Sequence, residues 1–134
     1  MPAKGKEIIM ALKIVRCSGC GKIALIMQDS ACPTKCCGEA MEVLEAGTVD
    51  AAREKHIPEV TVDGDKVTVQ VGSVIHPMLD AHYIQFIALE TESGVQVKYL
   101  KPGEEPKAVF GLGDAKPVAA YEFCNLHGLW KKEL

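Results

Sequence analysis

The sequence has no long apolar run and no excess of basic residues. No stretch approaches the roughly 20 apolar residues that a transmembrane helix requires, so we expect no membrane span. The 15 Lys and Arg residues are outnumbered by 18 Asp and Glu residues, which gives a formal charge of −3. A nucleic-acid-binding protein normally presents a basic face, and this balance argues against that class.

The N-terminal pattern is not the one expected of a cleavable export signal. Lys4 and Lys6 precede the apolar residues 8–12, but Lys13 interrupts the run and no small-residue cleavage site stands before Cys17. In a reducing compartment, six cysteines are more typical of metal ligands than of disulfides. We therefore expect a cytoplasmic protein whose cysteines bind metal.

Helical periodicity and internal repeats are scarce, and the chain after Pro58 alternates with the two-residue period of strands. Valines at alternate positions flank the turn 63–65, which predicts a hairpin. One helical turn, capped by Asp50, is predicted to end before His56. The pattern predicts a mainly β protein with an antiparallel β-sandwich. Further strands are predicted at residues 41–44, 83–91, 95–100, 108–110 and 118–123, the last of which is expected to be the final strand.

Length and cysteine density suggest how the chain is divided. At 134 residues it can hold one ordinary domain, or one small domain plus a very small one. Residues 1–12 are expected to form a loosely held extension, residues 13–44 a small metal-stabilised domain, and residues 45–134 the β-sandwich.

Residues 17–21 (Cys-Ser-Gly-Cys-Gly) have the form of a metal knuckle, with two thiolates two residues apart over glycines that permit a tight turn. In residues 32–38, Cys32, Cys36 and Cys37 compete to complete the site. Cys36 and Cys37 are adjacent, so both can bind one ion only if the backbone distorts. A piece this small needs a metal for much of its stability. The spacing indicates a four-thiolate site for zinc or iron.

The histidines suggest a second metal site. The chain has four histidines, and three loops are expected to bring together His56, His76 with His82, and His127 with Cys124. Thiolate and imidazole are ligands that soft transition metals prefer, although a single histidine in such a loop is more often solvated. Five ligands exceed the four of a structural zinc site and suit an octahedral metal with one open position. This set favours iron.

Four stretches resemble, in order, type and spacing, the signature segments of superoxide reductases. They are Glu54-Lys55-His56-Ile57-Pro58, residues 71–78, His82-Tyr83-Ile84 and residues 124–130. The N-terminal cysteines resemble the desulforedoxin domain of the two-iron form of this family, desulfoferrodoxin. The resemblance covers nearly everything after Lys13. It implies a desulforedoxin-like domain followed by a neelaredoxin-like, immunoglobulin-like antiparallel β-sandwich.

The resemblance also implies two iron sites. A catalytic ferrous iron would be bound by four imidazoles and an axial thiolate, from His56, His76, His82, His127 and Cys124. A second iron would be bound by the thiolates of Cys17, Cys20, Cys36 and Cys37. An axial thiolate donates electron density to iron. Backbone N–H groups after Cys124 are expected to hydrogen-bond its sulfur and tune that donation.

The implied reaction is the one-electron reduction of superoxide to hydrogen peroxide, with no production of dioxygen. Lys55 would attract superoxide and stabilise bound peroxide, and Glu54 would occupy the sixth iron position in the ferric state. Taken without the resemblance, both residues are better interpreted as a solvated charged surface. The family further implies a rubredoxin-type electron donor, a relay role for the four-thiolate iron, and a homodimer.

Two other classes remain open on the sequence. One is a non-catalytic iron electron-transfer or metal-binding protein that uses the N-terminal thiolates beside a purely structural sandwich. The other is a zinc-ribbon regulatory protein, which the acidic balance and the adjacent Cys36 and Cys37 disfavour. Metal analysis of one purified sample distinguishes these classes from the reductase.

Overall fold

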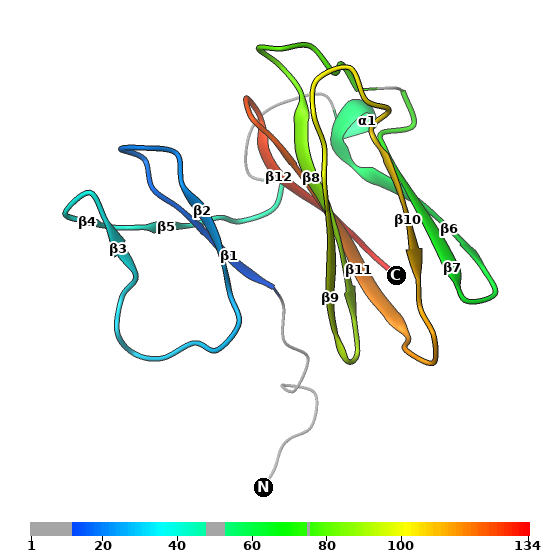
Figure 1. Ribbon diagram of the computed structural model, residues 1–134, viewed down its shortest axis with the longest axis horizontal. Coiled ribbons are helices and arrows are strands. Elements are labelled where there is room, and N and C mark those ends of the chain that lie inside the picture. The colour runs from blue at the N-terminus through cyan, green and yellow to red at the C-terminus, as the bar shows by residue number, and fades with distance from the viewer. Residues whose placement is uncertain (1–11, 48–52, 75) are drawn as a thin grey trace, which may run out of the picture. The chain divides into compact units, whose positions relative to one another are not determined.

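The computed structural model describes residues 12–47, 53–74 and 76–134, without the side chain of Glu54. It divides into two compact units, Met1–Leu44 and Glu45–Leu134. Both are built from antiparallel strands (Figure 1), which confirms the mainly β fold. The predicted cap Asp50 and residues 1–11 of the predicted extension lie outside the described residues. Among the described residues, no helix has the length and apolar character needed to span a membrane.

The first unit has short strands and few buried apolar side chains. Its main sheet has the order β2-β1-β5, and a second pair, β3 with β4, carries Cys36. Among its described residues, only Ile14, Val15 and Cys17 are buried hydrophobic residues. Such a small core leaves much of the stability to other interactions. The strands are β1 (Lys13–Arg16), β2 (Ile23–Ile26), β3 (Lys35–Cys36), β4 (Glu39–Ala40) and β5 (Glu42–Val43).

The second unit is a sandwich of two sheets, with the orders β10-β7-β6 and β12-β11-β8-β9 (Figure 1). Alternate side chains of β7, Val67, Val69 and Val71, are fully buried against Ile87 and Leu89 of β8. The two-residue period therefore directs one face of each sheet into the shared core. The elements are α1 (Arg53–His56), β6 (Pro58–Asp63), β7 (Lys66–Val71), β8 (Ile84–Thr91), β9 (Gly94–Tyr99), β10 (Lys107–Gly111), β11 (Pro117–Cys124) and β12 (Gly128–Glu133).

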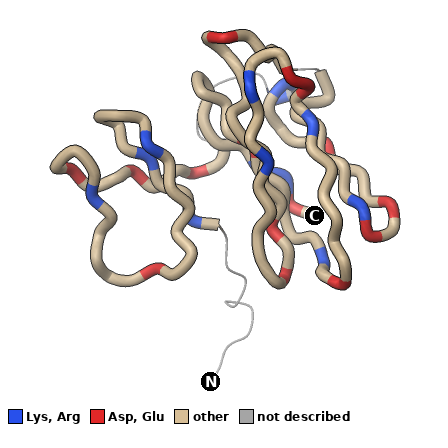
Figure 2. The backbone as a smooth tube through the Cα atoms, viewed as in Figure 1, with Lys and Arg blue, Asp and Glu red and all other residues tan. Residues whose placement is uncertain are grey.

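The strand predictions for the sandwich are largely confirmed. The hairpin of β6 and β7 turns between Asp63 and Lys66, with Gly64 in the left-handed region at φ 63°. The strands predicted at 83–91, 95–100, 108–110 and 118–123 correspond to β8, β9, β10 and β11, and each end differs by at most one residue. Figure 2 shows basic and acidic residues interleaved along these strands and turns.

Two predictions about element boundaries are wrong. The last strand is β12, not β11, and its pattern is hidden because the adjacent Leu129 and Trp130 are both buried, which breaks the two-residue alternation. The helical turn α1 includes His56 and ends there, with the Ile57 N–H donating to the Arg53 carbonyl oxygen at 2.9 Å. The helix ends here because Pro58 disfavours helical geometry at the residue before it, Ile57.

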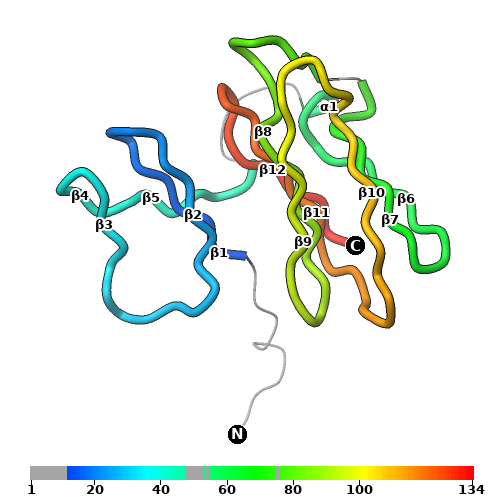
Figure 3. Tube along the Cα trace, in the orientation of Figure 1, coloured from blue at the N-terminus to red at the C-terminus, as the bar shows by residue number. Residues whose placement is uncertain are grey.

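Three connecting segments meet at one end of the sandwich. These are α1 before β6, the loop of residues 72–83 between β7 and β8, and the turn between β11 and β12 (Figure 3). The loop contains an isolated bridge between Leu79 and His82. Residues 76–83 form no strand, as Pro77 predicts. All four histidines and Cys124 lie on these segments or at the adjoining end of β11.

Candidate metal centres

The structure brings the four imidazoles into a closed cycle. The ring centroids are 4.7 Å apart for His56 and His76, 4.8 Å for His76 and His82, 5.0 Å for His82 and His127, and 4.9 Å for His127 and His56. Each ring meets the next nearly edge-on, with interplanar angles of 77° to 87°. The rings therefore surround a common centre instead of stacking on one another.

The ring nitrogens and one sulfur atom face that centre. His56 Nε2 lies 3.1 Å from His76 Nε2 and 3.1 Å from His127 Nδ1, while Cys124 Sγ lies 3.8 Å from the same Nδ1. Together with His82, each residue offers one ligand atom, and these atoms all lie within 4.8 Å of one another. A set of nitrogen and sulfur donors this close is what a transition metal binds.

Hydrogen bonding and burial prepare these rings to be neutral ligands. His76 Nδ1 lies 2.7 Å from the Pro77 carbonyl oxygen, which assigns the proton to Nδ1 and leaves the lone pair on Nε2. Burial lowers the pKa of His76 to about 4 and also lowers the pKa of His82. His82 Nε2 is buried without a hydrogen-bond partner among the described residues. An orphaned, neutral imidazole nitrogen fits a metal ion.

Cys124 is fully buried, and the pKa of its thiol is shifted by burial, by Leu126 and His127, and by Glu122. Burial raises the pKa of the thiol, while the backbone N–H groups of Leu126 and His127 hydrogen-bond the sulfur and lower it. This confirms the predicted N–H contacts after Cys124. The charge of Glu122 raises the thiol pKa further.

Glu122 is a buried residue of this region that the sequence analysis missed. It is fully buried two positions before Cys124 on β11, and neither carboxylate oxygen has a hydrogen-bond partner among the described residues. Burial raises the pKa of this carboxyl well above its ordinary value. Glu122 alternates with Ala120 on the predicted strand 118–123 and with Cys124 just after it, and this is the signal that could have revealed an inward-facing carboxyl.

Lys55 and Glu54 precede His56 on α1. Lys55 is exposed, and its charge helps to lower the pKa of His82 after the larger effects of burial and of His127. The helix therefore carries a cation whose field acts on the cycle of imidazoles. The side chain of Glu54 lies outside the described residues.

The second group of candidate ligands is in the first unit. The structure brings together the sulfur atoms of Cys17, Cys20, Cys36 and Cys37, all within 4.8 Å of one another. Cys20 Sγ lies 3.6 Å from Cys36 Sγ, which in turn lies 4.0 Å from Cys37 Sγ. All six cysteines of the chain are free, so no disulfide competes for these atoms. A four-thiolate group of this kind fits zinc or iron.

The backbone around these thiolates is shaped for close approach. The knuckle closes through Gly21 N–H to the Cys17 carbonyl oxygen at 2.8 Å, with Gly21 at φ 82°. Cys37 adopts φ 55°, the left-handed region that non-glycine residues rarely enter. This is the backbone distortion predicted for the adjacent Cys36 and Cys37. Gly19 has no room beneath these sulfurs, because an added Cβ would lie 3.3 Å from Cys37 Cβ.

The thiols of this group influence one another. The N–H of Cys20 and other donors, including the Cys36 thiol, lower the pKa of Cys17 to about 6, although burial opposes them. The hydrogen bond to Cys17 contributes most to raising the pKa of Cys36, to about 12. The hydrogen-bond donors around the Cys17 sulfur thus favour its thiolate form. A bound metal cation would stabilise the thiolate in their place.

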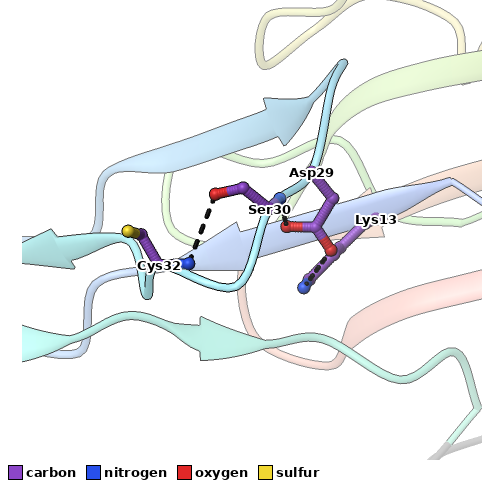
Figure 4. A network of polar contacts seen from close by, with 4 residues as sticks. All are labelled: Lys13, Asp29, Ser30 and Cys32. Carbon is purple, nitrogen blue, oxygen red and sulfur yellow. Dashed lines mark hydrogen bonds and ion pairs between the residues drawn. The ribbon is translucent and has the colours of Figure 1, made fainter.

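Cys32 lies outside both groups. It follows β2, where its N–H donates to Ser30 Oγ at 3.3 Å (Figure 4). Asp29 accepts the Ser30 N–H at 2.9 Å and pairs with Lys13 Nζ at 2.8 Å. These contacts tie the loop to β1. Of the alternatives that the cysteine spacing left open, the structure gathers the set without Cys32.

The similarity of the chain to known proteins covers most of its length. Residues 48–133 match the family model described as Desulfoferrodoxin. A desulfoferrodoxin of Nitratidesulfovibrio vulgaris is 45% identical over 123 residues, which cover 90% of this chain and 95% of that protein. A desulfoferrodoxin of Syntrophotalea carbinolica is 42% identical over 122 residues, which cover 91% and 96%. The crystal structure of the superoxide reductase from Treponema pallidum is 39% identical, has a TM-score of 0.78, and covers 92% of this chain and 100% of that chain. This chain therefore belongs to the desulfoferrodoxin family.

Proposed function

We propose that this protein is a superoxide reductase, an oxidoreductase that reduces superoxide by one electron to hydrogen peroxide. The observation that carries the proposal is the closed cycle of four imidazoles beside the Cys124 sulfur, with all ligand atoms within 4.8 Å of one another. The similarity to the Treponema pallidum superoxide reductase supports it. A non-catalytic electron-transfer role that uses the N-terminal thiolates is not favoured, because it does not account for the four histidines gathered with Cys124.

The metal of this site is iron. Five donors exceed the four that a structural zinc takes, and an octahedral metal held by them would still be able to bind a small molecule. When bound, ferrous iron supplies the electron for superoxide, and a thiolate ligand increases its electron density. The proposed ligands are His56, His76, His82 and His127, with Cys124 as the sulfur ligand.

The protein contributes the environment of the reaction. Burial keeps His76 and His82 neutral, so that protons do not compete with the metal for their nitrogens. The N–H groups that reach the Cys124 sulfur stabilise its thiolate form. Lys55 attracts the superoxide anion, because a cation near a site raises the local concentration of an anionic substrate. Glu54 is the second proposed catalytic residue, on the basis of the family resemblance.

In this proposal, the first unit binds a second iron through Cys17, Cys20, Cys36 and Cys37. The proposed domains are an extension of residues 1–12, a small metal-binding domain of residues 13–44 and the β-sandwich of residues 45–134. The compact group of four sulfurs and the boundary between units at Leu44 and Glu45 support this assignment. Each superoxide that is reduced consumes one electron, which a donor must replace. A rubredoxin-type protein is the proposed electron donor, with the four-thiolate iron as relay.

The proposed assembly is a homodimer, and the proposed location is the cytoplasm. Strand β9 is at one edge of its sheet and exposes Val97 and Tyr99, the latter by 82%. An exposed edge strand is a surface on which a second copy can pair.

The free state of all six cysteines supports a reducing compartment, such as the proposed cytoplasm.

The stoichiometry of the products tests the activity. Iron-loaded, prereduced protein is mixed with a known amount of superoxide, and hydrogen peroxide and dioxygen are both measured. A reductase releases one peroxide for each superoxide consumed and no dioxygen. Dioxygen released together with half as much peroxide indicates dismutation and overturns the proposal. Iron analysis accompanies this assay. Cys124→Ser should abolish the thiolate-to-iron absorption band of the histidine site and leave the bands of the four-thiolate iron. A protein that takes up zinc alone, or whose absorption spectrum is unchanged by this substitution, is not the proposed enzyme.

Lys55→Ala tests the attraction of superoxide. We expect a lower second-order rate of superoxide consumption and a weaker dependence of that rate on ionic strength. Lys66→Ala is the matched control, because Lys66 is exposed at the opposite end of β7 from the loop that carries His76. Equal rates and equal salt dependence in the two variants remove Lys55 from the mechanism.

A further inference from the structure

The side chain of Asn125 binds the loop that carries His82. Asn125 Oδ1 accepts the Tyr83 N–H at 2.9 Å, and Asn125 Nδ2 donates to the Ala81 carbonyl oxygen at 3.1 Å. The backbone N–H of Asn125 also donates to the Tyr83 carbonyl oxygen at 3.1 Å. One residue next to Cys124 therefore contacts the residues on both sides of His82.

The orientation of this amide is determined by its partners. A backbone N–H can only donate and a backbone carbonyl can only accept, so the oxygen must face Tyr83 and the nitrogen must face Ala81. A flipped amide would place two donors together and two acceptors together. The Asn125 side chain is thus suited to one arrangement of the loop.

Asn125 acts where the sheet no longer holds the loop. The pairing of β8 with β11 shifts register between Phe123 and Cys124, and β8 begins only at Ile84. The next amide, Ile84 N–H, is also bound by a side chain, Met78 Sδ, at 3.4 Å. Sulfur is a weak acceptor. The amide of Asn125 therefore supplies the firmer link between the end of β11 and this loop.

The imidazole of His82 has no such link of its own. Its Nε2 is buried and has no hydrogen-bond partner among the described residues. By contrast, the ring of His76 is held by the Pro77 carbonyl oxygen through Nδ1. The position of His82 Nε2 therefore depends on how its backbone is held.

We propose that Asn125 is a positioning residue whose amide locks the loop of His82 to the turn of Cys124 and so sets the spacing of these two ligands. This inference rests on the metal site of the proposed function. It concerns metal binding, and its test does not depend on superoxide chemistry.

The test follows Zn²⁺ binding by NMR in the full-length protein, with a competing chelator. Zn²⁺ is diamagnetic, and the imidazole resonances report only this site because all four histidines of the chain lie in it. Asn125→Ala should lower the Zn²⁺ affinity of this site about 10- to 100-fold, as is typical when a residue that orients a ligand is lost. It should also abolish exchange protection of the Tyr83 amide and shift the His82 resonance most.

Two further variants separate positioning from general stability. Asn125→Asp keeps an acceptor for the Tyr83 N–H and removes the donor to the Ala81 carbonyl, so it should keep the Tyr83 protection and still shift the His82 resonance. Val67→Ala removes buried core volume at the far end of β7. It should lower stability and leave the Zn²⁺ affinity and the His82 resonance unchanged.

Wild-type Zn²⁺ affinity and Tyr83 protection in Asn125→Ala overturn the proposal. So does an equal shift of all four imidazole resonances in either Asn125 variant, because that marks a general loosening of the site. If the protein binds Zn²⁺ as expected but fails to reduce superoxide when loaded with iron, the proposed function falls and the role of Asn125 stands.

Discussion

Trp130 is stacked on His56, with ring centroids 5.1 Å apart and ring planes at 27°. The same indole donates its Nε1–H to the carbonyl oxygen of His127 at 3.0 Å. His56 lies on α1 and His127 in the turn between β11 and β12, so one buried side chain contacts the ring of one histidine and the backbone of another on a different segment.

Trp130→Phe separates the two contacts. The phenyl ring still packs on His56 but offers no donor to the partly buried His127 carbonyl, and a lost hydrogen bond costs about 0.5–1.5 kcal/mol. We expect a lower free energy of unfolding in urea and a shift of the His127 imidazole resonance in the metal-free protein. Tyr99→Phe, at an exposed position of β9, is the control and should change neither. A Trp130→Phe protein as stable as the wild type would show that the indole N–H contributes nothing.

Gly19→Ala should damage the four-thiolate group and spare the histidine site. An added Cβ would lie 3.3 Å from Cys37 Cβ, which is closer than an ordinary contact, so Cys37 would have to shift by a few tenths of an ångström. Its sulfur is one of the four of this group. We expect weaker metal binding by the thiolates, measured by chelator competition, with unchanged imidazole resonances. Gly111→Ala is the matched control, because nothing lies within 4 Å of its added Cβ. Equal metal affinity in both variants contradicts the tight fit at Gly19.

The pKa of Asp29 should respond to Lys13. The Lys13 ammonium and then the Ser30 N–H lower this pKa below its ordinary value of 3.8. Lys13→Met should raise it toward that value, although the Ser30 contact still holds it lower. A titration of the Asp29 carboxyl carbon by NMR measures the change, with Lys22→Met as control. An Asp29 pKa that is the same in both variants would show that the ion pair between Lys13 and Asp29 does not form in solution.

The sign of the stability effect follows from this shift. A carboxyl with a depressed folded-state pKa stabilises the fold above its unfolded pKa, and the contribution disappears as the pH falls through the folded-state value. The first unit should therefore lose this contribution below about pH 4 in the wild type. In Lys13→Met, the loss should be smaller. Both partners are partly exposed, with 38% and 53% of their side-chain surfaces accessible, so the effect should be modest.

The strands of the sandwich could be predicted from the sequence because their cause is local. Val67, Val69 and Val71 alternate with polar residues, and Gly64 stands where the hairpin needs a left-handed residue. The two-residue period and the turn chemistry are properties of neighbouring residues. The same reasoning failed for β12, where Leu129 and Trp130 are buried on opposite faces of one strand.

The residue types of the metal groups could also be predicted, since the chain has only four histidines and one dense run of cysteines. The backbone strain at Cys37 followed from its position next to Cys36. Spacing alone did not distinguish Cys32 from the other cysteines; only the family resemblance implied the set without it. Its place in a loop tied to β1 is a consequence of the contact between Asp29 and Lys13, residues 16 apart in the chain.

The sequence by itself determined the strand pattern, the candidate ligands and the family resemblance. Only the tertiary structure decided which atoms face one another. Trp130 reaches His56 and Asn125 reaches Tyr83 although tens of residues separate each pair along the chain, and Glu122 is buried beside Cys124 inside the folded sandwich. Contacts of this kind depend on side-chain direction and on the register between strands, and neither is encoded in a local motif.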